Sequence, residues 1–171
     1  NNRFGVPNTA LNFNGIEAAN GSTVEINHLL FNIGQAEYTI HFWFRPDNLS
    51  QISRTFFNTI PHTGVAMTFN NNNSPGYTSY LLGPANAMWD YYYVHGSFNS
   101  FQTTEWYSLA LVKQGTVYYK YINGILESTF SAPDAASYDY DVELRISGIG
   151  SNVQTFAGDI DDFGIWDKAL N

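Results

Sequence analysis

Three aspartates crowd one apolar, strand-like run near the end of the sequence. Asp159, Asp161 and Asp162 lie within residues 156–166 and directly precede a Phe–Gly–Ile–Trp segment. Strand alternation predicts that Asp159 and Asp161 share one face and that Asp162 takes the other. Carboxylates this close repel one another and are costly to bury unless a cation or hydrogen bonds relieve them. Ca²⁺ takes oxygen ligands and could supply that charge, whereas backbone amides of a neighbouring loop could cap the same carboxylates.

A second group of residues could bind a sugar. Residues 89–95 form a run of aromatic side chains, and alternation places every second one on a single face of a predicted strand. Flat rings with polar edges are typical binding anchors, and the amides of an Asn-rich loop upstream can meet paired sugar hydroxyls. The alternative is that these rings fill the core. The shallow glycan site that we predict comprises Trp89, Tyr91, Tyr93, His95, Asn72, Asn73 and Tyr77.

Patterns for catalysis are missing. Glycoside hydrolysis needs two carboxylates that flank the scissile bond, but the glutamates of this chain are scattered and mostly near strand ends. The four histidines show no metal-binding spacing, and no GxSxG, P-loop or GxGxxG motif occurs. We therefore predict that the chain is not an enzyme.

Composition narrows the class of protein further. The 171 residues are 44% hydrophobic and 17% aromatic but only 13% charged, which favours strands over a helical bundle or disorder. The net charge of −8 and the lack of clustered Lys and Arg argue against nucleic acid as a partner. No apolar run approaches the ~20 residues of a membrane-spanning helix, so we expect no membrane insertion. The absence of cysteine excludes disulfides and thiolate chemistry and fits a bacterial surface protein.

Short β patterns alternate with turn signals along the whole chain. Helical periodicity is missing, no linker or internal repeat interrupts the pattern, and the Asn123–Gly124 pair predicts a type I′ hairpin. We therefore expect an all-β fold, a two-sheet antiparallel β-sandwich, in a single domain over residues 1–171. With no signal peptide and an abrupt start, we interpret the chain as a module of a longer protein. The expected strands are 11–13, 23–26, 38–46, 55–60, 65–69, 77–82, 88–94, 106–113, 116–122, 125–130, 142–147 and 156–166.

Ordered segments of the sequence resemble the laminin-G-like, concanavalin A-like lectin/glucanase jelly-roll family. Residues 10–15 (ALNFNG) resemble its opening strand, residues 38–46 (YTIHFWFRP) its Trp-bearing strand, and residues 105–124 its central hairpin. Residues 158–163 (GDIDDF) and 168–170 (KAL) resemble its close. The resemblance implies a concanavalin A-like jelly roll whose first and last strands pair.

The resemblance also implies a structural calcium ion. Members often hold one with the closing strand's aspartate and carbonyls near the opening strand, which here correspond to Asp161 with Asn14 and Gly15. The family normally has Asp where Asn14 stands, so this chain has one charge less. Hydrolases of this fold carry a Glu-x-Asp-x-x-Glu strand, and no such spacing occurs here.

Together these observations predict a non-catalytic carbohydrate-binding or adhesion module. We expect it to belong to an extracellular or cell-surface protein and to contain a structural Ca²⁺ ion. Its partner would be a polysaccharide or cell-surface glycan, besides other domains of the same chain. The alternatives are a polysaccharide-degrading enzyme domain of the same fold and a structural or protein-binding spacer in a large adhesin.

Overall fold

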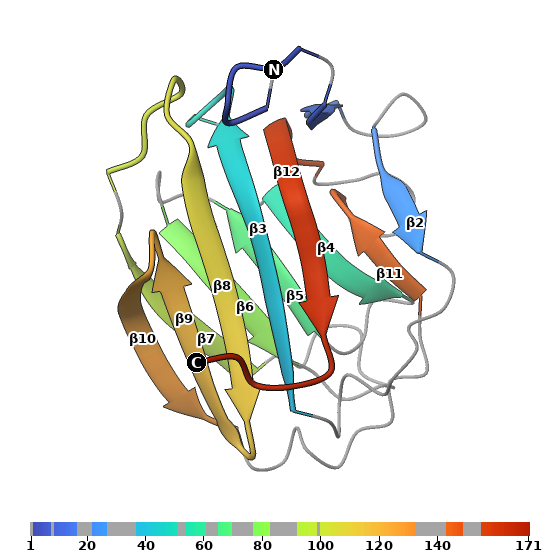
Figure 1. The fold of residues 1–171 in the computed structure, drawn as a ribbon. Coiled ribbons are helices and arrows are strands. Elements are labelled where there is room, and N and C mark those ends of the chain that lie inside the picture. The colour runs from blue at the N-terminus through green and yellow to red at the C-terminus, as the bar shows by residue number, and fades with distance from the viewer. Residues whose placement is uncertain are drawn as a thin grey trace.

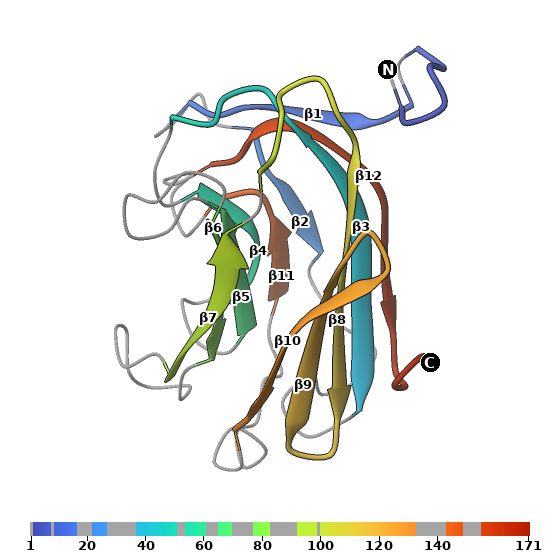
Figure 2. The same ribbon diagram turned by 90° about the vertical axis from the view of Figure 1, so that its left-hand side faces the viewer.

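The protein is an all-β sandwich of two antiparallel six-stranded sheets (Figures 1 and 2). The computed structural model describes residues 2–7, 9–16, 22–26, 37–50, 54–60, 65–69, 77–82, 92–98, 100–132, 143–148 and 155–171. Among them is no helix long and apolar enough to cross a membrane. The two antiparallel sheets confirm the predicted fold class, an all-β two-sheet sandwich.

The first sheet, sheet A, carries both the first and the last strand of the chain. Its strands, in spatial order, are β1 (Leu11–Asn14), β12 (Ala157–Trp166), β3 (Tyr38–Pro46), β8 (Tyr107–Gln114), β9 (Val117–Ile122) and β10 (Ile125–Ser131). β1 and β12 pair directly, as the family resemblance implies.

Sheet B lies behind sheet A in Figure 1 and beside it in Figure 2. Its strands, in spatial order, are β2 (Val24–Ile26), β11 (Glu143–Ile146), β4 (Arg54–Ile60), β5 (Val65–Phe69), β6 (Tyr77–Leu82) and β7 (Tyr92–Phe98). β7 continues beyond Val94, where the predicted strand ended, because its pairing with β6 extends to Phe98 opposite Tyr77.

Aromatic side chains fill the space between the sheets. On β3, the fully buried Phe42 and Phe44 meet Phe56 of β4, with ring centroids 5.1 and 4.8 Å away. Such pairs add about 0.5–1.5 kcal/mol each to the gain from burial. A chain with few leucines thus builds its core from phenylalanine, which leaves the alternate residues of β3 for the outside.

The predicted turn chemistry is present at the β9–β10 hairpin. Asn123 and Gly124 both have positive φ angles, 51° and 74°, as a type I′ turn requires. β3 ends at Pro46, which has no N–H to continue the ladder.

A bulge in β12 corrects one prediction. The pairing of β12 with β3 shifts register between Asp161 and Gly164, and Asp162 has a φ of 47°. As a result Phe163 packs inward, stacked on Phe42 at 5.6 Å, and Asp162 is exposed on the same side of the sheet as Asp161. Strict alternation would have directed the Asp162 carboxylate toward the core, which the bulge avoids.

Gly158 sets the start of β12. Its φ is 148°, and a Cβ at this position would lie 2.2 Å from the carbonyl oxygen of Arg45. Only glycine lets β12 approach β3 so closely beside Pro46, its cross-strand partner.

Candidate functional site

The surface of sheet A that points away from the core gathers aromatic and charged residues. Since Phe42 and Phe44 point inward, His41, Trp43 and Arg45 point outward. Register extends this surface to neighbouring strands. We call it the outer face, and its principal residues are His41, Trp43, Arg45, Trp106, Tyr119, Tyr121, Asp159 and Asp161.

Small residues separate two rows of rings on the outer face. On β8, Ser108 pairs with Trp43 and Ala110 pairs with His41. Ala110 also pairs with Tyr121 of β9, so the rings of β3 and β9 flank a strip of small side chains. Burial alternates along β9, which places Tyr118 inside and leaves Tyr121 half-buried on the outer face. The β8 residues between the two rows of rings, Ser108 and Ala110, are therefore small.

A short turn at the start of the chain lies against this surface. The Asn2 side-chain oxygen accepts hydrogen bonds from the backbone N–H groups of Phe4 and Val6, at 3.0 and 2.9 Å. The Asn2 N–H donates to the carbonyl of Val6 at 2.9 Å, and the Gly5 N–H donates to that of Asn2 at 3.0 Å. We call residues 2–6 the hook. These bonds fix its shape and present Arg3 to β12 and β3.

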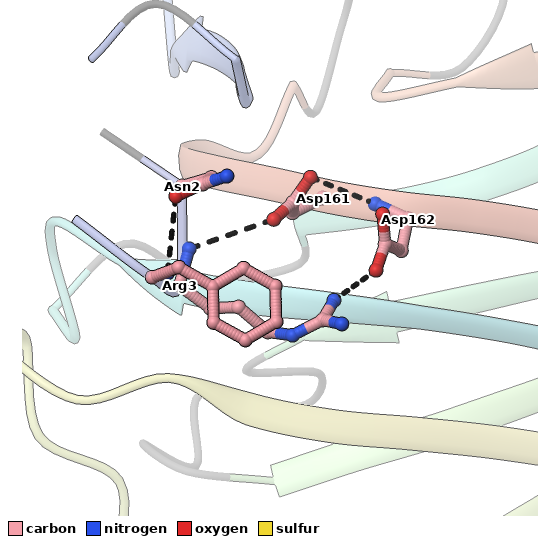
Figure 3. Close-up of polar contacts among 5 residues, drawn as sticks. Asn2, Arg3, Asp161 and Asp162 are labelled. Carbon is pink, nitrogen blue, oxygen red and sulfur yellow. Dashed lines mark hydrogen bonds and ion pairs between the residues drawn. The ribbon is translucent and has the colours of Figure 1, made fainter. Parts of the chain in front are cut away.

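Arg3 meets an acid and a tryptophan at once. Its guanidinium forms an ion pair with Asp162 (Figure 3). The same guanidinium lies 4.8 Å from the Trp43 ring centroid and 4.4 Å from that of Phe4. Its backbone N–H points at the Asp161 carboxylate at the long distance of 3.5 Å. Asp161 also accepts the Asp162 backbone N–H at 3.0 Å. Arg3 is thus the cationic centre of an Asp–Arg–Trp set.

A second Asp–Arg–Trp set lies further along β12. Asp159, only 3% exposed, forms an ion pair with Arg45 and accepts a hydrogen bond from the Asn12 amide at 2.8 Å. The Arg45 guanidinium lies 5.4 Å from the ring centroid of Trp106. Desolvation, followed by the negative charge of Asp159, raises the pKa of nearby Asp47 above its ordinary value. The outer face therefore presents two tryptophans, each beside a matched Asp–Arg pair.

His41 is an ionisable group beside Trp43 on the outer face. It packs edge-on against Trp43 with ring centroids 6.2 Å apart. Desolvation and the positive charge of Arg3 lower the pKa of His41, while Asp162 acts in the opposite direction. His41 is therefore held toward its neutral form, in which one ring nitrogen donates and the other accepts a hydrogen bond.

The residues predicted to bind calcium do not come together. Asn14 pairs with Ala157, and Asp161 lies four residues further along β12, about 13 Å away at strand rise. Calcium ligands lie about 2.3–2.6 Å from the ion, so Asp161 cannot share one ion with carbonyls of Asn14 or of Gly15, which lies further away still. The expectation that Asn14 and Gly15 lie beside Asp161 is corrected by this register.

The carboxylates that flank Asp161 on β12 are already paired with arginine. Asp162 pairs with Arg3, and Asp159 pairs with Arg45. The side-chain oxygen of Asn14 accepts the backbone N–H groups of Ile16 and Ser22, at 3.1 and 3.3 Å. No cluster of three or more acidic, His or Cys residues suited to a metal occurs within the described ranges. These residues do not fit the implied ion, and calcium binding elsewhere in the chain stays a prediction.

The predicted glycan residues fall partly outside the described residues. Asn72, Asn73, Trp89 and Tyr91 lie outside them. Tyr77 begins β6 opposite Phe98, and on β7 Tyr93 pairs with Leu81 and His95 with Ser79. The glycan site at these residues stays a prediction.

Sequence reasoning missed the two Asp–Arg–Trp sets. Alternation within residues 38–46 was sufficient to place Trp43 and Arg45 on one face, but no sequence signal pointed to Arg3. Its partner Asp162 lies 159 positions away, and the contact exists only because β1 pairs with β12.

Comparison with protein-family models matches residues 18–171 to the family described as the Concanavalin A-like lectin/glucanases superfamily, Laminin_G_3, which confirms the resemblance. Comparison with curated proteins finds no match. Among solved structures, a mutant of HCR D/C VPI 5995 is similar, with a TM-score of 0.72 and 13% identity over 98% of this chain and 42% of the other.

Two further similar structures are binding domains of botulinum neurotoxin DC. The domain in complex with rat synaptotagmin II has a TM-score of 0.70 and 14% identity over 93% of this chain and 40% of the other. The domain in complex with SialylT has a TM-score of 0.68 and 15% identity over 93% and 39%. This chain spans about two fifths of the length of each. At this identity the likeness shows the shared fold.

Proposed function

Because the chain belongs to the concanavalin A-like lectin/glucanases superfamily, we propose that it is a non-catalytic module that binds carbohydrate through the outer face of sheet A. The observation that carries this proposal is the pair of tryptophans, Trp43 and Trp106, each beside an arginine–aspartate pair on one surface. The similar fold of botulinum neurotoxin binding domains also supports a binding role.

The chemistry of the outer face suits a sugar. An indole ring can stack on the C–H face of a pyranose, while arginine donates to and aspartate accepts from its hydroxyl groups. The surface is open, so little area is buried and the hydroxyls must lose water. We therefore expect micromolar to millimolar dissociation constants, about −8 to −4 kcal/mol.

A glycan array followed by calorimetry tests the proposal. The parent chain should bind a defined glycan, and Trp43→Ala and Trp106→Ala should each weaken binding about tenfold or more while the protein stays folded. Glu25→Gln is the control, because Glu25 lies on β2 of sheet B, whereas the outer face belongs to sheet A. Two results contradict the proposal: no glycan binds to the parent chain, or both Trp variants bind the glycan as tightly as the parent chain does.

The earlier predicted site at residues 72–95 enters the same experiment. If Trp89→Ala abolishes binding while Trp43→Ala and Trp106→Ala keep it, the ligand is held by the Trp89–His95 segment and not by the outer face. Repeating the binding measurement in EDTA tests the predicted calcium ion.

Asp47 gives the enzyme alternative its one favourable observation. A carboxyl group with a raised pKa beside a second carboxylate is the usual pattern of a glycosidase acid and its partner. However, Arg45 and Asn12 already engage Asp159, which leaves it poorly placed to act as nucleophile or base. We expect no reducing ends from polysaccharide panels. Turnover that Asp47→Asn abolishes would establish the enzyme instead.

An extracellular or cell-surface location is part of the proposal, because polysaccharides and cell-surface glycans are met there. Labelling of intact cells with an antibody against the folded chain tests it. A signal that appears only after permeabilisation contradicts it.

A further inference from the structure

The acids of β12 need positive charge, and the chain supplies it from its own first residues. Asp161 is only 9% exposed, and Asp162 is its direct neighbour on the same side of sheet A. Two adjacent carboxylates in such a place favour a cation. Arg3 lies between them and Trp43, with an ion pair to Asp162 and its backbone N–H directed at Asp161.

The hook makes this contact more than an isolated surface ion pair. Its internal hydrogen bonds to Asn2 order the turn (Figure 3), so the Arg3 backbone is already held in place. The guanidinium side chain is largely buried, at 19% exposure, against the rings of Phe4 and Trp43. Guanidinium is planar and weakly hydrated, and can pair with a carboxylate while it stacks on a ring.

We propose that the hook is a cationic latch: Arg3 takes the place at Asp161 and Asp162 that a divalent cation would occupy, and it fastens residues 2–6 to the outer face without metal. The latch does not depend on whether the outer face binds carbohydrate. The β1–β12 register keeps the implied calcium ligands apart, and the positive charge beside the acids comes from arginine instead.

A melting experiment on the intact chain tests the latch. Wild type, Arg3→Gln, Asp162→Asn and the double variant are melted in EDTA and in millimolar CaCl₂. Any difference in wild-type Tm between the two buffers should be equally large in Asp162→Asn, because calcium bound elsewhere in the chain would not involve this acid. Each single variant should melt about 2–4 °C lower, and the double variant no lower than the worse single one, because both changes remove one interaction.

Fluorescence separates the latch from a general loss of stability. The fluorescence of Trp43 is obtained by subtracting the fluorescence of each Trp43→Phe counterpart from that of the protein that retains Trp43. Quenching of this Trp43 fluorescence by acrylamide is measured well below the Tm. Arg3→Gln should increase this quenching, because Arg3 covers the ring. The matched control is Glu25→Gln, which breaks the exposed Arg145–Glu25 ion pair of sheet B and should leave Trp43 unchanged.

Two outcomes would overturn the latch. In one, the wild-type Tm falls in EDTA and returns with calcium, and the Asp162→Asn variant shows no such response. A metal ion would then be bound by Asp162. The other is an Arg3→Gln variant whose Tm and Trp43 quenching both equal those of the wild type.

Discussion

At the residue scale, Arg3 and Arg45 neutralise the aspartates of one strand, β12. Each lies between an aspartate of β12 and a tryptophan, so each carboxylate is neutralised and each ring is partly covered. The crowding of Asp159, Asp161 and Asp162 predicted from sequence that positive charge or hydrogen bonds must be present. The source of that charge was not predictable, because Arg3 meets β12 only through long-range pairing of strands.

His41 reports on the charges of Arg3 and Asp162. We expect NMR titration to give His41 a pKa below 6.5, with Arg3→Gln shifting it upward and Asp162→Asn shifting it further down. A lowered folded pKa means that stability is fully present above the unfolded value and is lost as pH falls through the folded one. Shifts of the same sign in both variants would contradict the assigned charges.

Asp47 should show the opposite pH dependence. Its pKa is raised in the fold, so the ionised form is disfavoured and stability decreases as pH rises from the unfolded pKa through the folded one. Asp47→Asn should therefore raise the Tm near pH 7 and have little effect near pH 3. An equal effect at both pH values, measured by calorimetry, would show that desolvation of the carboxyl group does not matter.

β12 determines the outer face at the scale of single elements. Its bulge brings Asp162 out and Phe163 in, and Gly158 lets the strand lie close to β3. The strands were predictable from alternation and turn residues, including the Asn123–Gly124 hairpin. The bulge was not predictable, because the alternation of apolar and polar residues does not show where an extra residue enters a strand. The predicted strand at residues 88–94 likewise ended too early, since the pairing with β6 that carries β7 on to Phe98 is not visible in the sequence.

Gly158→Ala tests the close contact of β12 with β3. The added Cβ would meet the Arg45 carbonyl at 2.2 Å, so we expect a loss of about 2–4 kcal/mol of unfolding free energy in urea. Gly124→Ala is the control, because Gly124 has a positive φ but open space around its Cβ position. A similar loss in both variants would mean that backbone conformation, and not the contact with Arg45, decides the cost.

At the scale of the whole molecule, the two sheets meet in an aromatic core and through a buried lysine of sheet A that donates hydrogen bonds to sheet B. Low charge, many aromatic residues and the lack of helical periodicity were sufficient to predict a two-sheet sandwich. The side chain of Lys120, 2% exposed, extends from β9 to β6, where it donates to the Thr78 carbonyl and hydroxyl at 2.8 and 2.9 Å. Its ion pair with Glu127, at 2.7 Å, neutralises it. Desolvation lowers the pKa of Lys120, and Glu127 opposes that shift.

Glu127→Gln should therefore destabilise the sandwich. It leaves a buried ammonium group without its anion, for which we expect a loss of about 3–5 kcal/mol in urea unfolding. The variant with both Lys120→Met and Glu127→Leu should lose much less, because no charge remains buried. If the double variant were the less stable of the two, the ion pair itself would be a major source of stability.

Carbohydrate binding by the outer face is the central claim, and the four tryptophan indole N–H signals test it most directly. A ¹H–¹⁵N spectrum is recorded while a glycan that binds on the array is added, with each signal assigned by a Trp→Phe variant. We predict that the Trp43 and Trp106 signals shift together with one saturation curve. Shifts of Trp89 alone, or no indole shift at saturating glycan, would contradict a site on the outer face.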